Sequence, residues 1–153
     1  MQPRLPATVL IIDEDEDTRR ISRAVLEHLG HRVYTATNAV EGLALATAMR
    51  PDVVVLELLL RPHTGTKLLS LLRADQRTCA IPVVAYTAAA ALRDRERLLR
   101  FGFDEVALKP CEPWALAVLV EDVARRAAAA PAPAEICWDN STCALPPFGA
   151  AAG

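Results

Sequence analysis

Five short segments with the character of strands recur between residues 8 and 108 of the chain; four are mainly apolar runs of four to six residues, and one, 32–36, alternates. Short runs of this kind, rich in β-branched residues and bounded by polar or turn-forming residues, are typical of strands buried on both faces. We therefore expect a sheet that is covered on both sides. The predicted strands are 8–12, 32–36, 53–58, 81–86 and 105–108.

Segments with a helical spacing of apolar residues separate these runs. The first ends at Gly30, a residue suited to the left-handed backbone that closes a helix. Asn38 is suited to cap a second helix over 40–49, in which Gly42 would cost about 1 kcal/mol relative to alanine. The other predicted helices are a leucine-rich one through Leu68–Leu72, an alanine-rich one ending at Phe101, and one over 113–126.

Strands and helices thus alternate five times along the chain. This alternation predicts a parallel sheet with helices on both faces, because parallel neighbours need a long crossover connection. Right-handed crossovers leave few ways to wind five strands. We expect an α/β fold with strand order 2-1-3-4-5, the flavodoxin-like doubly wound three-layer sandwich.

The pattern divides the chain into one domain at 7–126 and a C-terminal segment at 127–153. The segment begins with an Ala/Pro run and continues without periodicity, a composition that predicts disorder. Ile136, Trp138 and Phe148 could form a short binding motif within it, although an inert extension is the simpler interpretation.

Charge and cysteine usage narrow the partners and the compartment. The formal net charge is −2, so no broad basic field attracts nucleic acid or an anionic membrane. The apolar stretch 53–60 is too short to cross a bilayer, and the first residues do not resemble a secretory signal. The four cysteines lack Cys-x-x-Cys spacing and indicate reduced thiols. We expect a cytoplasmic protein with no nucleic-acid or membrane partner.

Polar residues stand at the ends of the central predicted strands. They are Asp13 with Glu14, Glu57, Thr87 and Lys109. In doubly wound sheets ligands bind beyond the carboxyl ends of the strands, so we expect these side chains to converge. Three carboxylates in a small volume repel one another unless a cation joins them, and oxygen ligands suit Mg²⁺. A lysine and a hydroxyl beside the metal would bind phosphoryl oxygens, so the pattern predicts a metal-assisted phosphoryl site or its remnant.

Four blocks of sequence resemble the receiver domains of response regulators. The blocks are 9–19 (VLIIDEDEDTR), 51–58 (PDVVVLEL), 81–88 (IPVVAYTA) and 106–110 (VALKP). Each block alone is a weak signal, but their order and spacing are those of the family over about residues 7 to 126. The resemblance implies a bacterial, non-enzymatic module of two-component phosphorelay signalling. A histidine kinase would phosphorylate it, and it would regulate a downstream signalling protein by contact.

The resemblance assigns the acidic chemistry residue by residue. Asp13 and Glu14 match the metal-binding acidic pair, and Glu57 occupies the phosphoacceptor position. The backbone carbonyl of Leu59 matches a further metal contact. Mg²⁺ is the implied cofactor, with Asp13, Glu14, Glu57 and Leu59 as its ligands.

The resemblance also implies a switch. Thr87 matches the switch hydroxyl, and Lys109 matches the lysine that contacts the phosphoryl group. Val106 stands at the position of the switch aromatic, and Pro110 follows a peptide bond that is cis in the family. The outer faces of the fourth and fifth helices match a surface that often carries the partner or a homodimer contact. No helix-turn-helix or catalytic output pattern follows residue 126, so we expect a stand-alone receiver.

Several of these positions depart from the family. The extra methylene of Glu57, which replaces aspartate, moves the carboxylate by roughly 1 Å, a displacement that can cost about a hundredfold in an oriented reaction. A glutamate here often mimics the phosphorylated state or ends phosphorylation. Glu14 replaces the usual second aspartate, and Val106 lacks an aromatic ring. Arg61 stands where the family has a proline, and Pro62 follows it. We predict a degenerate pseudo-receiver with weak Mg²⁺ binding; a receiver still phosphorylated weakly by a histidine kinase is the alternative.

Simpler structural roles stay open for the same residues. The acidic run 13–17 could be a first helical turn favoured by the helix dipole. Glu57 could pair with Lys109 in a purely structural bridge, and Thr87 could cap the fourth helix. A calcium loop is excluded because the required glycine and closing glutamate are missing. The residues expected as solvated surface groups are Asp104, Glu105, His28, His31 and His63.

An enzyme of another class, the haloacid-dehalogenase-type Mg²⁺-dependent phosphohydrolase, also places Asp-x-Asp after its first strand. Asp13 and Asp15 fit that motif, but Asp17 stands where those enzymes have threonine or valine. Glu121 and Asp122 fall within a predicted helix rather than after a late strand, and no cap domain is recognisable. The phosphohydrolase is therefore the disfavoured alternative.

Overall fold

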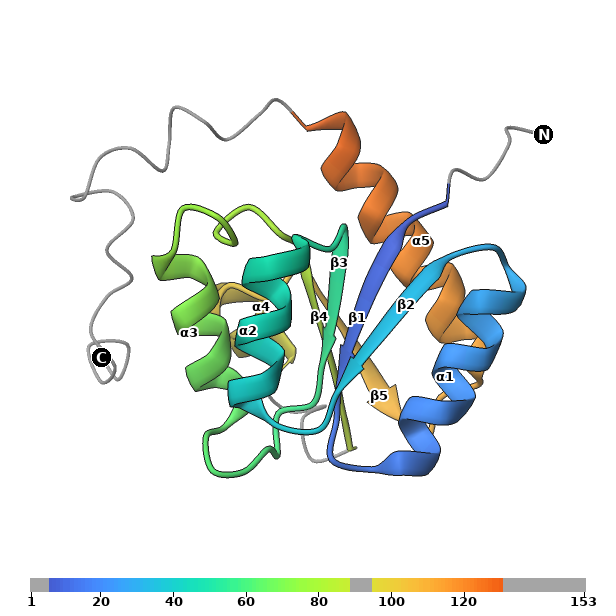
Figure 1. Ribbon diagram of the computed structural model, residues 1–153, viewed down its shortest axis with the longest axis horizontal. Helices are drawn as coiled ribbons and strands as arrows, with labels where there is room; N and C mark the ends of the chain where they lie inside the picture. Colours follow the sequence, from blue (N-terminus) through green and yellow to red (C-terminus); the bar gives the residue numbers. More distant parts are fainter. Residues whose placement is uncertain (1–5, 89–94, 131–153) are drawn as a thin grey trace.

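The computed structural model of the chain describes residues 6–88 and 95–130, which form five strands and five helices in strict alternation (Figure 1). The strands are β1 (Thr8–Ile12), β2 (Arg32–Ala36), β3 (Val53–Leu56), β4 (Val83–Ala88) and β5 (Glu105–Lys109). The helices are α1 (Glu16–His28), α2 (Ala39–Met49), α3 (Gly65–Ala74), α4 (Arg95–Phe101) and α5 (Pro113–Ala129).

The strands form one parallel sheet in the order β2-β1-β3-β4-β5, which confirms the predicted topology. β1 lies inside the sheet and pairs with β2 on one side and β3 on the other, so that Leu10 stands between Tyr34 and Val54. Helices α1 and α5 cover one face of the sheet, and α2, α3 and α4 cover the other (Figure 1). All carboxyl ends of the strands therefore point to the same edge.

Two separate cores flank the sheet, and alternate residues of each strand enter different ones. Leu10, Ile12 and Leu56 belong to the core on the side of α2–α4. Val9 and Ile11 belong to the core on the side of α1 and α5. Because both faces are buried, β1 from Val9 onward and the whole of β3 are apolar at every position, as the sequence pattern indicated.

Three elements differ from the sequence-based prediction by two or more residues at a boundary. β3 ends at Leu56 rather than 58: the Glu57 amide still donates to the Ile12 carbonyl of β1, but the amides of Leu58 and Leu59 bond the Glu57 side chain instead of a neighbouring strand. β4 runs two residues later than predicted, over Val83–Ala88. α5 continues to Ala129, three residues beyond the predicted helix end at 126, because alanines extend a helix readily. The rest of the predicted tail, at 131–153, lies outside the described residues.

Gly42 has a packing role that its low helix propensity concealed. It lies where α2 crosses β1, and a Cβ atom there would stand 2.6 Å from Cδ1 of Ile12. The missing side chain thus lets α2 approach the sheet closely. The glycine that lowers the helix propensity at this position is therefore the residue that allows α2 to pack closely against β1.

A part-buried arginine ties the amino edge of the sheet together. Arg73, at the end of α3, donates to the carbonyls of Cys79, Ile81 and Gly102 and to Asp104 Oδ2 at 3.0 Å. The same oxygen of Asp104 accepts from the Val83 amide at 2.8 Å. Arg73 and Asp104 thus bind the starts of β4 and β5 to α3, while the Asp104 side chain stays 44% exposed, as expected of a loop charge.

His31 is a buried polar group at this edge. Its Nδ1 accepts from the Ala7 amide at 3.1 Å, and its Nε2 lies 2.8 Å from Glu121 Oε1 on α5. The side chain is 2% exposed, so the predicted surface position was wrong. The ring fastens the chain before β1 and the start of β2 to α5.

Two further findings limit the class of protein. None of the described helices combines the length and the apolar character needed to cross a membrane. Cys79 and Cys111 are free thiols, and the other two cysteines lie outside the described residues.

Candidate functional site

Three charged side chains meet at the carboxyl edge of the sheet. Lys109, at the end of β5, places Nζ 2.6 Å from Asp13 Oδ2 and 2.7 Å from Glu57 Oε2. Asp13 follows β1 and Glu57 follows β3, and both residues are buried. The lysine chain therefore crosses β4 to reach two carboxylates that adjacent strands deliver. The sequence predicted this convergence.

The second oxygen of each carboxylate also has a donor. Glu57 Oε1 accepts from the amides of Leu58 and Leu59 at 2.6 and 3.1 Å. Asp13 Oδ1 accepts from the Asp15 amide at 2.9 Å. All four carboxylate oxygens of the pair are thus bonded within the protein.

The hydrogen bonds fix the charge state of this cluster. Burial by itself would raise the pKa of Glu57, but hydrogen bonds from Lys109, the Leu59 amide and the Thr87 hydroxyl outweigh it and lower that pKa. Burial alone would lower the pKa of Lys109, and its bonds to Asp13 and Glu57 raise it instead. The Glu57 carboxylate and the Lys109 ammonium are therefore both ionised at neutral pH.

Two neighbours on β4 complete the surroundings of the cluster. Thr87 is 3% exposed and lies near enough to Glu57 to help lower the pKa of that carboxyl group. Because Thr87 lies inside β4, it does not cap the fourth helix. The ring of Tyr86 lies 5.2 Å from Lys109 Nζ, a cation–π distance that sequence reasoning missed. Its strand-end position beside Thr87 was the available signal.

The remaining predicted metal ligands lie at the rim. The Glu14 carboxylate accepts from the Arg61 amide and stands 3.9 Å from Arg61 Nε, at a side-chain exposure of 37%. The Leu59 side chain is 73% exposed, and its amide is committed to Glu57. Glu14 therefore contacts the loop after β3 rather than the central cluster.

This arrangement does not fit the predicted Mg²⁺ site. Lys109 occupies the oxygens through which Asp13 and Glu57 would both reach a cation, and their other oxygens accept from backbone amides. Within residues 6–88 and 95–130, no group of three or more His, Cys, Asp or Glu side chains is placed to hold a metal ion. The ammonium of Lys109 takes the charge-balancing place that the prediction gave to the metal.

Gly65 positions the loop that carries Glu57, and the sequence analysis missed this role. A Cβ atom on Gly65 would lie 2.4 Å from the carbonyl oxygen of Glu57 and 2.8 Å from Cα of Leu58. The Gly65 amide also donates to the Leu58 carbonyl at 2.9 Å. The signal was a glycine at the start of a helix directly after the acceptor loop.

Comparison with known proteins identifies the family. Residues 9–121 match the response regulator receiver domain. The chain belongs to this family. It is 34% identical over 121 residues to an uncharacterized 14.6 kDa protein of Leptolyngbya boryana, covering 79% of this chain and 92% of that one. It is 30% identical over 106 residues to the polar-differentiation response regulator DivK of Brucella anthropi, covering 69% and 86%.

Longer relatives and solved structures agree. The chain is 32% identical over 118 residues to the transcriptional regulator RpaA of Synechocystis, covering 77% of this chain but only 49% of RpaA. A response regulator from Chloroflexus aurantiacus has a TM-score of 0.74 at 26% identity, covering 80% of this chain and all of that one. The chemotaxis protein CheY4 of Vibrio cholerae has a TM-score of 0.72 at 24% identity, covering 78% and 99%. The fold is therefore flavodoxin-like, and the chain is a receiver module of two-component signal transduction.

Receiver domains generally signal by binding histidine kinases and effector domains rather than by enzymatic turnover, and they typically bind Mg²⁺ at the phosphorylation site. In this receiver the switch-aromatic position, Val106, is buried in the core on the side of α4. The Lys109–Pro110 peptide bond is cis, and so is Arg61–Pro62.

The rest of the acidic run serves the helix that follows it. Asp15 caps α1: its carboxylate accepts from the Thr18 amide at 3.0 Å and from the Thr18 hydroxyl. These bonds lower the pKa of Asp15. Glu16 and Asp17 occupy the first turn, where the helix dipole favours negative charge. Asp15 is thus unavailable for the Asp-x-Asp chemistry of a phosphohydrolase, and the comparisons do not favour that class.

Proposed function

We propose that this receiver regulates a partner protein by contact without accepting a phosphoryl group at residue 57. The observation that carries the proposal is the closed bonding of Glu57. One carboxylate oxygen is held by Lys109 at 2.7 Å, and the other accepts from two backbone amides. A carboxylate that attacks phosphorus needs an oxygen turned toward the donor, and neither oxygen of Glu57 has that freedom.

The charge balance supports the same proposal. Lys109 already neutralises one of the two carboxylates, and both of its bonds to them are short. A metal ion would have to displace the ammonium from Asp13 and Glu57 before it gained any ligand there. Breaking a buried ion pair is costly, because it leaves an uncompensated charge behind. The carboxyl edge of the sheet is therefore held in one arrangement, with Lys109 bonded to both carboxylates.

The partners follow from the family and remain part of the proposal. A histidine kinase or a downstream signalling protein would bind this receiver in the cytoplasm, with no role for nucleic acid or membrane. Arg95 on α4 and Arg126 on α5 both pair with Glu105 on β5, so this surface is rigid and charged. We place a partner or homodimer contact on it.

Phosphorylation of Glu57→Asp tests the proposal. Incubation with acetyl phosphate and Mg²⁺, followed by intact-mass measurement, should leave the unaltered protein without added mass. The Glu57→Asp variant should gain one phosphoryl group, because the shorter side chain withdraws from Lys109 and the two amides. Glu57→Gln, similar in shape but without a carboxylate, is the matched control.

The possible outcomes separate the alternatives. Phosphorylation of the unaltered protein at Glu57, located by peptide mapping, would overturn the proposal and favour a weakly phosphorylated receiver. Turnover of a generic phosphomonoester with Mg²⁺ would revive the phosphohydrolase. If neither occurs, capture of the same partner by the unaltered protein and by Glu57→Gln would separate the contact function from the charge of Glu57.

A further inference from the structure

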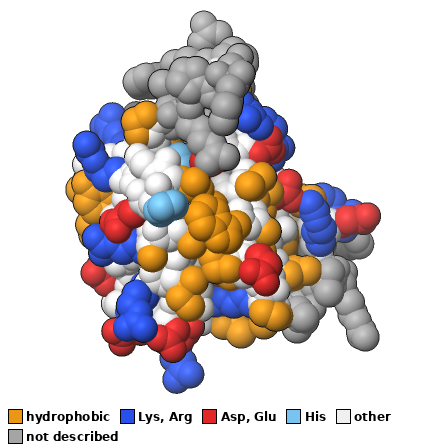
Figure 2. Space-filling model, turned by 90° about the vertical axis from the view of Figure 1, so that its right-hand side faces the viewer, with side chains coloured by type: hydrophobic (Ala, Val, Ile, Leu, Met, Phe, Trp, Pro, Cys, Tyr) orange, Lys and Arg blue, Asp and Glu red, His pale blue; other side chains and the backbone are white. Residues whose placement is uncertain are grey.

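An apolar surface on the outside of α1 and α5 has no role in the site described above. Ile21 on α1 is 50% exposed, and Trp114 and Val118 on α5 are 52% and 61% exposed. We call these three residues the α1–α5 patch. Figure 2 shows hydrophobic side chains gathered on this face beside a histidine. Contiguous apolar exposure of this kind marks binding surfaces more often than isolated exposed residues do.

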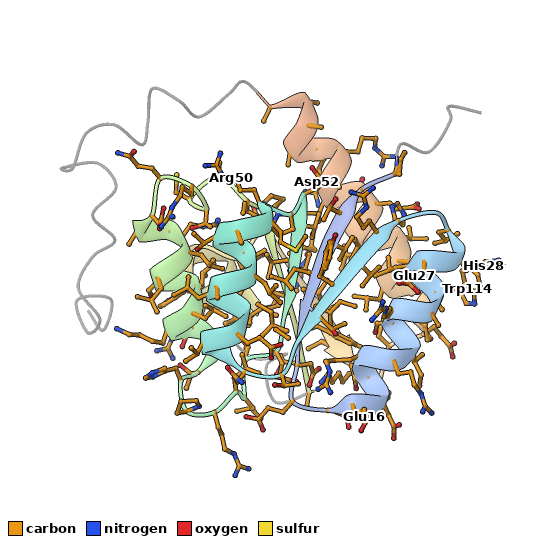
Figure 3. The ribbon with its side chains drawn as sticks, viewed as in Figure 1. Glu16, Glu27, His28, Arg50, Asp52 and Trp114 are labelled. Atoms are coloured by element: carbon orange, nitrogen blue, oxygen red, sulfur yellow. The ribbon has the colours of Figure 1, made fainter. Side chains whose placement is uncertain are left out.

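The patch is ordered by its own contacts. The rings of His28 and Trp114 meet edge to face with centroids 5.9 Å apart, and both lie on the outer side of this layer (Figure 3). Below the surface, Leu116 and Ala117 on α5 and Leu26 on α1 fill the core. A rigid helix pair therefore presents the exposed tryptophan in a fixed orientation.

We propose that the segment Ile136–Trp138 of this same chain binds the α1–α5 patch. The segment follows α5 after a short linker, and it carries two large apolar residues two positions apart. In an extended chain such residues lie on the same side, about 6.6 Å apart. Trp114 and Val118 are one helical turn apart, about 6 Å along α5. The two spacings match.

The length of the linker matches as well. Along α5, Val118 lies about 18 Å and Trp114 about 24 Å before Ala130. An extended chain that runs back from there advances about 3.1–3.3 Å per residue, so that Ile136 reaches about 19 Å and Trp138 about 26 Å. Ile136 thus meets Val118 and Trp138 meets Trp114 when the segment runs antiparallel to α5.

The sequence of the linker suits this path. α5 ends at Ala129, and the capping residue Ala130 is already extended, with a ψ of 144°. Pro131 and Pro133 follow, and proline both ends a helix and favours the extended polyproline conformation. Binding within one chain also proceeds at a high effective concentration, which offsets the ordering of a segment that cannot fold alone. The segment would compete with any outside partner for the patch.

Disulfide trapping at residue 136 tests the proposal, because Cys137 faces away from α5 when Ile136 and Trp138 face it. In a full-length background that carries Cys79→Ser, Cys111→Ser, Cys137→Ser, Cys143→Ser and Ile136→Cys, the further change Val118→Cys should allow an intramolecular disulfide between positions 118 and 136 under a mild dithiol oxidant such as diamide. Val40→Cys is the matched control: Val40 is 62% exposed, close to Val118, but lies on α2 across the sheet. The Val118→Cys chain should react about tenfold faster or more, because the effective concentration of its two thiols is higher.

Each other outcome of this experiment overturns the proposal. Equal rates for the two variants would make the segment an inert extension. A disulfide that joins two chains, at a rate that rises with protein concentration, would make a second copy the occupant of the patch. Peptide mapping of the oxidised monomer identifies the bond formed.

Fluorescence gives a second reading that needs no new cysteine. The chain has two tryptophans, so Trp114→Phe leaves Trp138 as the sole emitter and keeps an aromatic ring in the patch. Trp138 should emit at a shorter wavelength than free tryptophan in water, and Val118→Lys should remove that difference. Val40→Lys should leave it unchanged. Emission of free tryptophan from the Trp114→Phe chain itself would overturn the proposal.

Discussion

The two edges of the sheet use the same kinds of bonds for different purposes. At the carboxyl edge, Lys109 joins two carboxylates, and the backbone amides around Glu57 hold a side chain rather than another strand. At the amino edge, Arg73 donates mostly to backbone carbonyls, and Asp104 accepts from a strand amide. At the carboxyl edge the charged side chains pair mainly with one another, whereas at the amino edge the charged side chains bond mainly to backbone groups.

This difference separates a site from a structural joint. The cluster at the carboxyl edge contains one more negative charge than positive, and it exists only because three strand ends meet there. Arg73 and Asp104 balance one another and satisfy carbonyls of the loops before β4 and β5. A change at the amino edge should therefore affect folding stability alone, whereas a change at the carboxyl edge should also affect chemistry.

Loss of Arg73 is the largest expected effect. Arg73→Met keeps the apolar stem but removes donors from three carbonyls and leaves Asp104 without its cation, so we expect a loss of about 3–5 kcal/mol in the free energy of unfolding. Urea denaturation measures it. Arg77→Met is the control, since Arg77 pairs with Asp75 at the surface and should cost less than about 1 kcal/mol. If the two variants lost the same free energy of unfolding, Arg73 would contribute no more to stability than the surface ion pair of Arg77.

Removal of Lys109 comes next and depends on pH. Lys109→Met leaves Asp13 and Glu57 facing one another while buried, and we expect a loss of about 2–3 kcal/mol at pH 7. Without the lysine, desolvation raises the pKa of Glu57, so protonation on acidification should relieve part of that loss. Denaturation of both proteins from pH 4 to 8 should show the gap narrowing at low pH. If the difference in stability between the two proteins did not change with pH, charge would not be the main determinant of stability at this edge.

In the unaltered protein, by contrast, the stability contributed by this cluster should be lost at low pH. The pKa of Glu57 is lowered on folding from an ordinary value of 4.5, so its stabilising contribution is present above that pH and is lost as pH falls through the folded value. The pKa of Lys109 is raised from 10.5, so its contribution is present below that pH and is lost as pH rises through the folded value. Together they predict a plateau of stability between about pH 5 and pH 10 from this cluster.

The carboxyl edge was predictable because its residues follow apolar runs whose strand character is plain. Asp13, Glu57 and Lys109 each come directly after such a run, and parallel strands bring those positions to one edge. What could not be predicted was the partner of each oxygen. The extra methylene of Glu57 marks a departure in the sequence, but only the structure places both oxygens on Lys109 and the amides of the next two residues.

The amino edge was not predictable, for a physical reason. Arg73 lies at the end of a helix, where a basic residue ordinarily faces solvent and interacts with the helix dipole. Its bonds to Cys79, Ile81 and Gly102 depend on how two loops approach in space. His31 likewise follows a glycine turn and gives no sign of burial. No spacing in the sequence encodes these contacts.

Gly65→Ala should lower the free energy of unfolding moderately, and it tests the rigidity of the carboxyl edge in the same comparison. The new Cβ would stand 2.4 Å from the Glu57 carbonyl oxygen, a backbone atom that cannot turn aside. We expect a loss of about 1–3 kcal/mol in urea denaturation, because backbone must shift. Gly42→Ala is the control: its new Cβ meets the flexible end of Ile12, and the gain of about 1 kcal/mol in helix propensity opposes the clash. If Gly42→Ala proved the more destabilising, the loop after β3 would accommodate the new Cβ atom more easily than the short contacts of Gly65 indicate.

Asp15→Ala should have the smallest effect and tests where the site ends within the carboxyl edge. Asp15 caps α1 through the Thr18 amide, and loss of such a cap costs about 1 kcal/mol. Asp17→Ala is the control, because Asp17 is 78% exposed and only 4.0 Å from Arg20, and it should cost a few tenths of a kcal/mol, roughly the value of one exposed pair. In the Glu57→Asp background, neither change should alter the amount of phosphoryl group gained. A loss of phosphorylation with Asp15→Ala would move Asp15 from the helix into the site, and the boundary drawn between Asp13 and the acidic run after it would no longer hold.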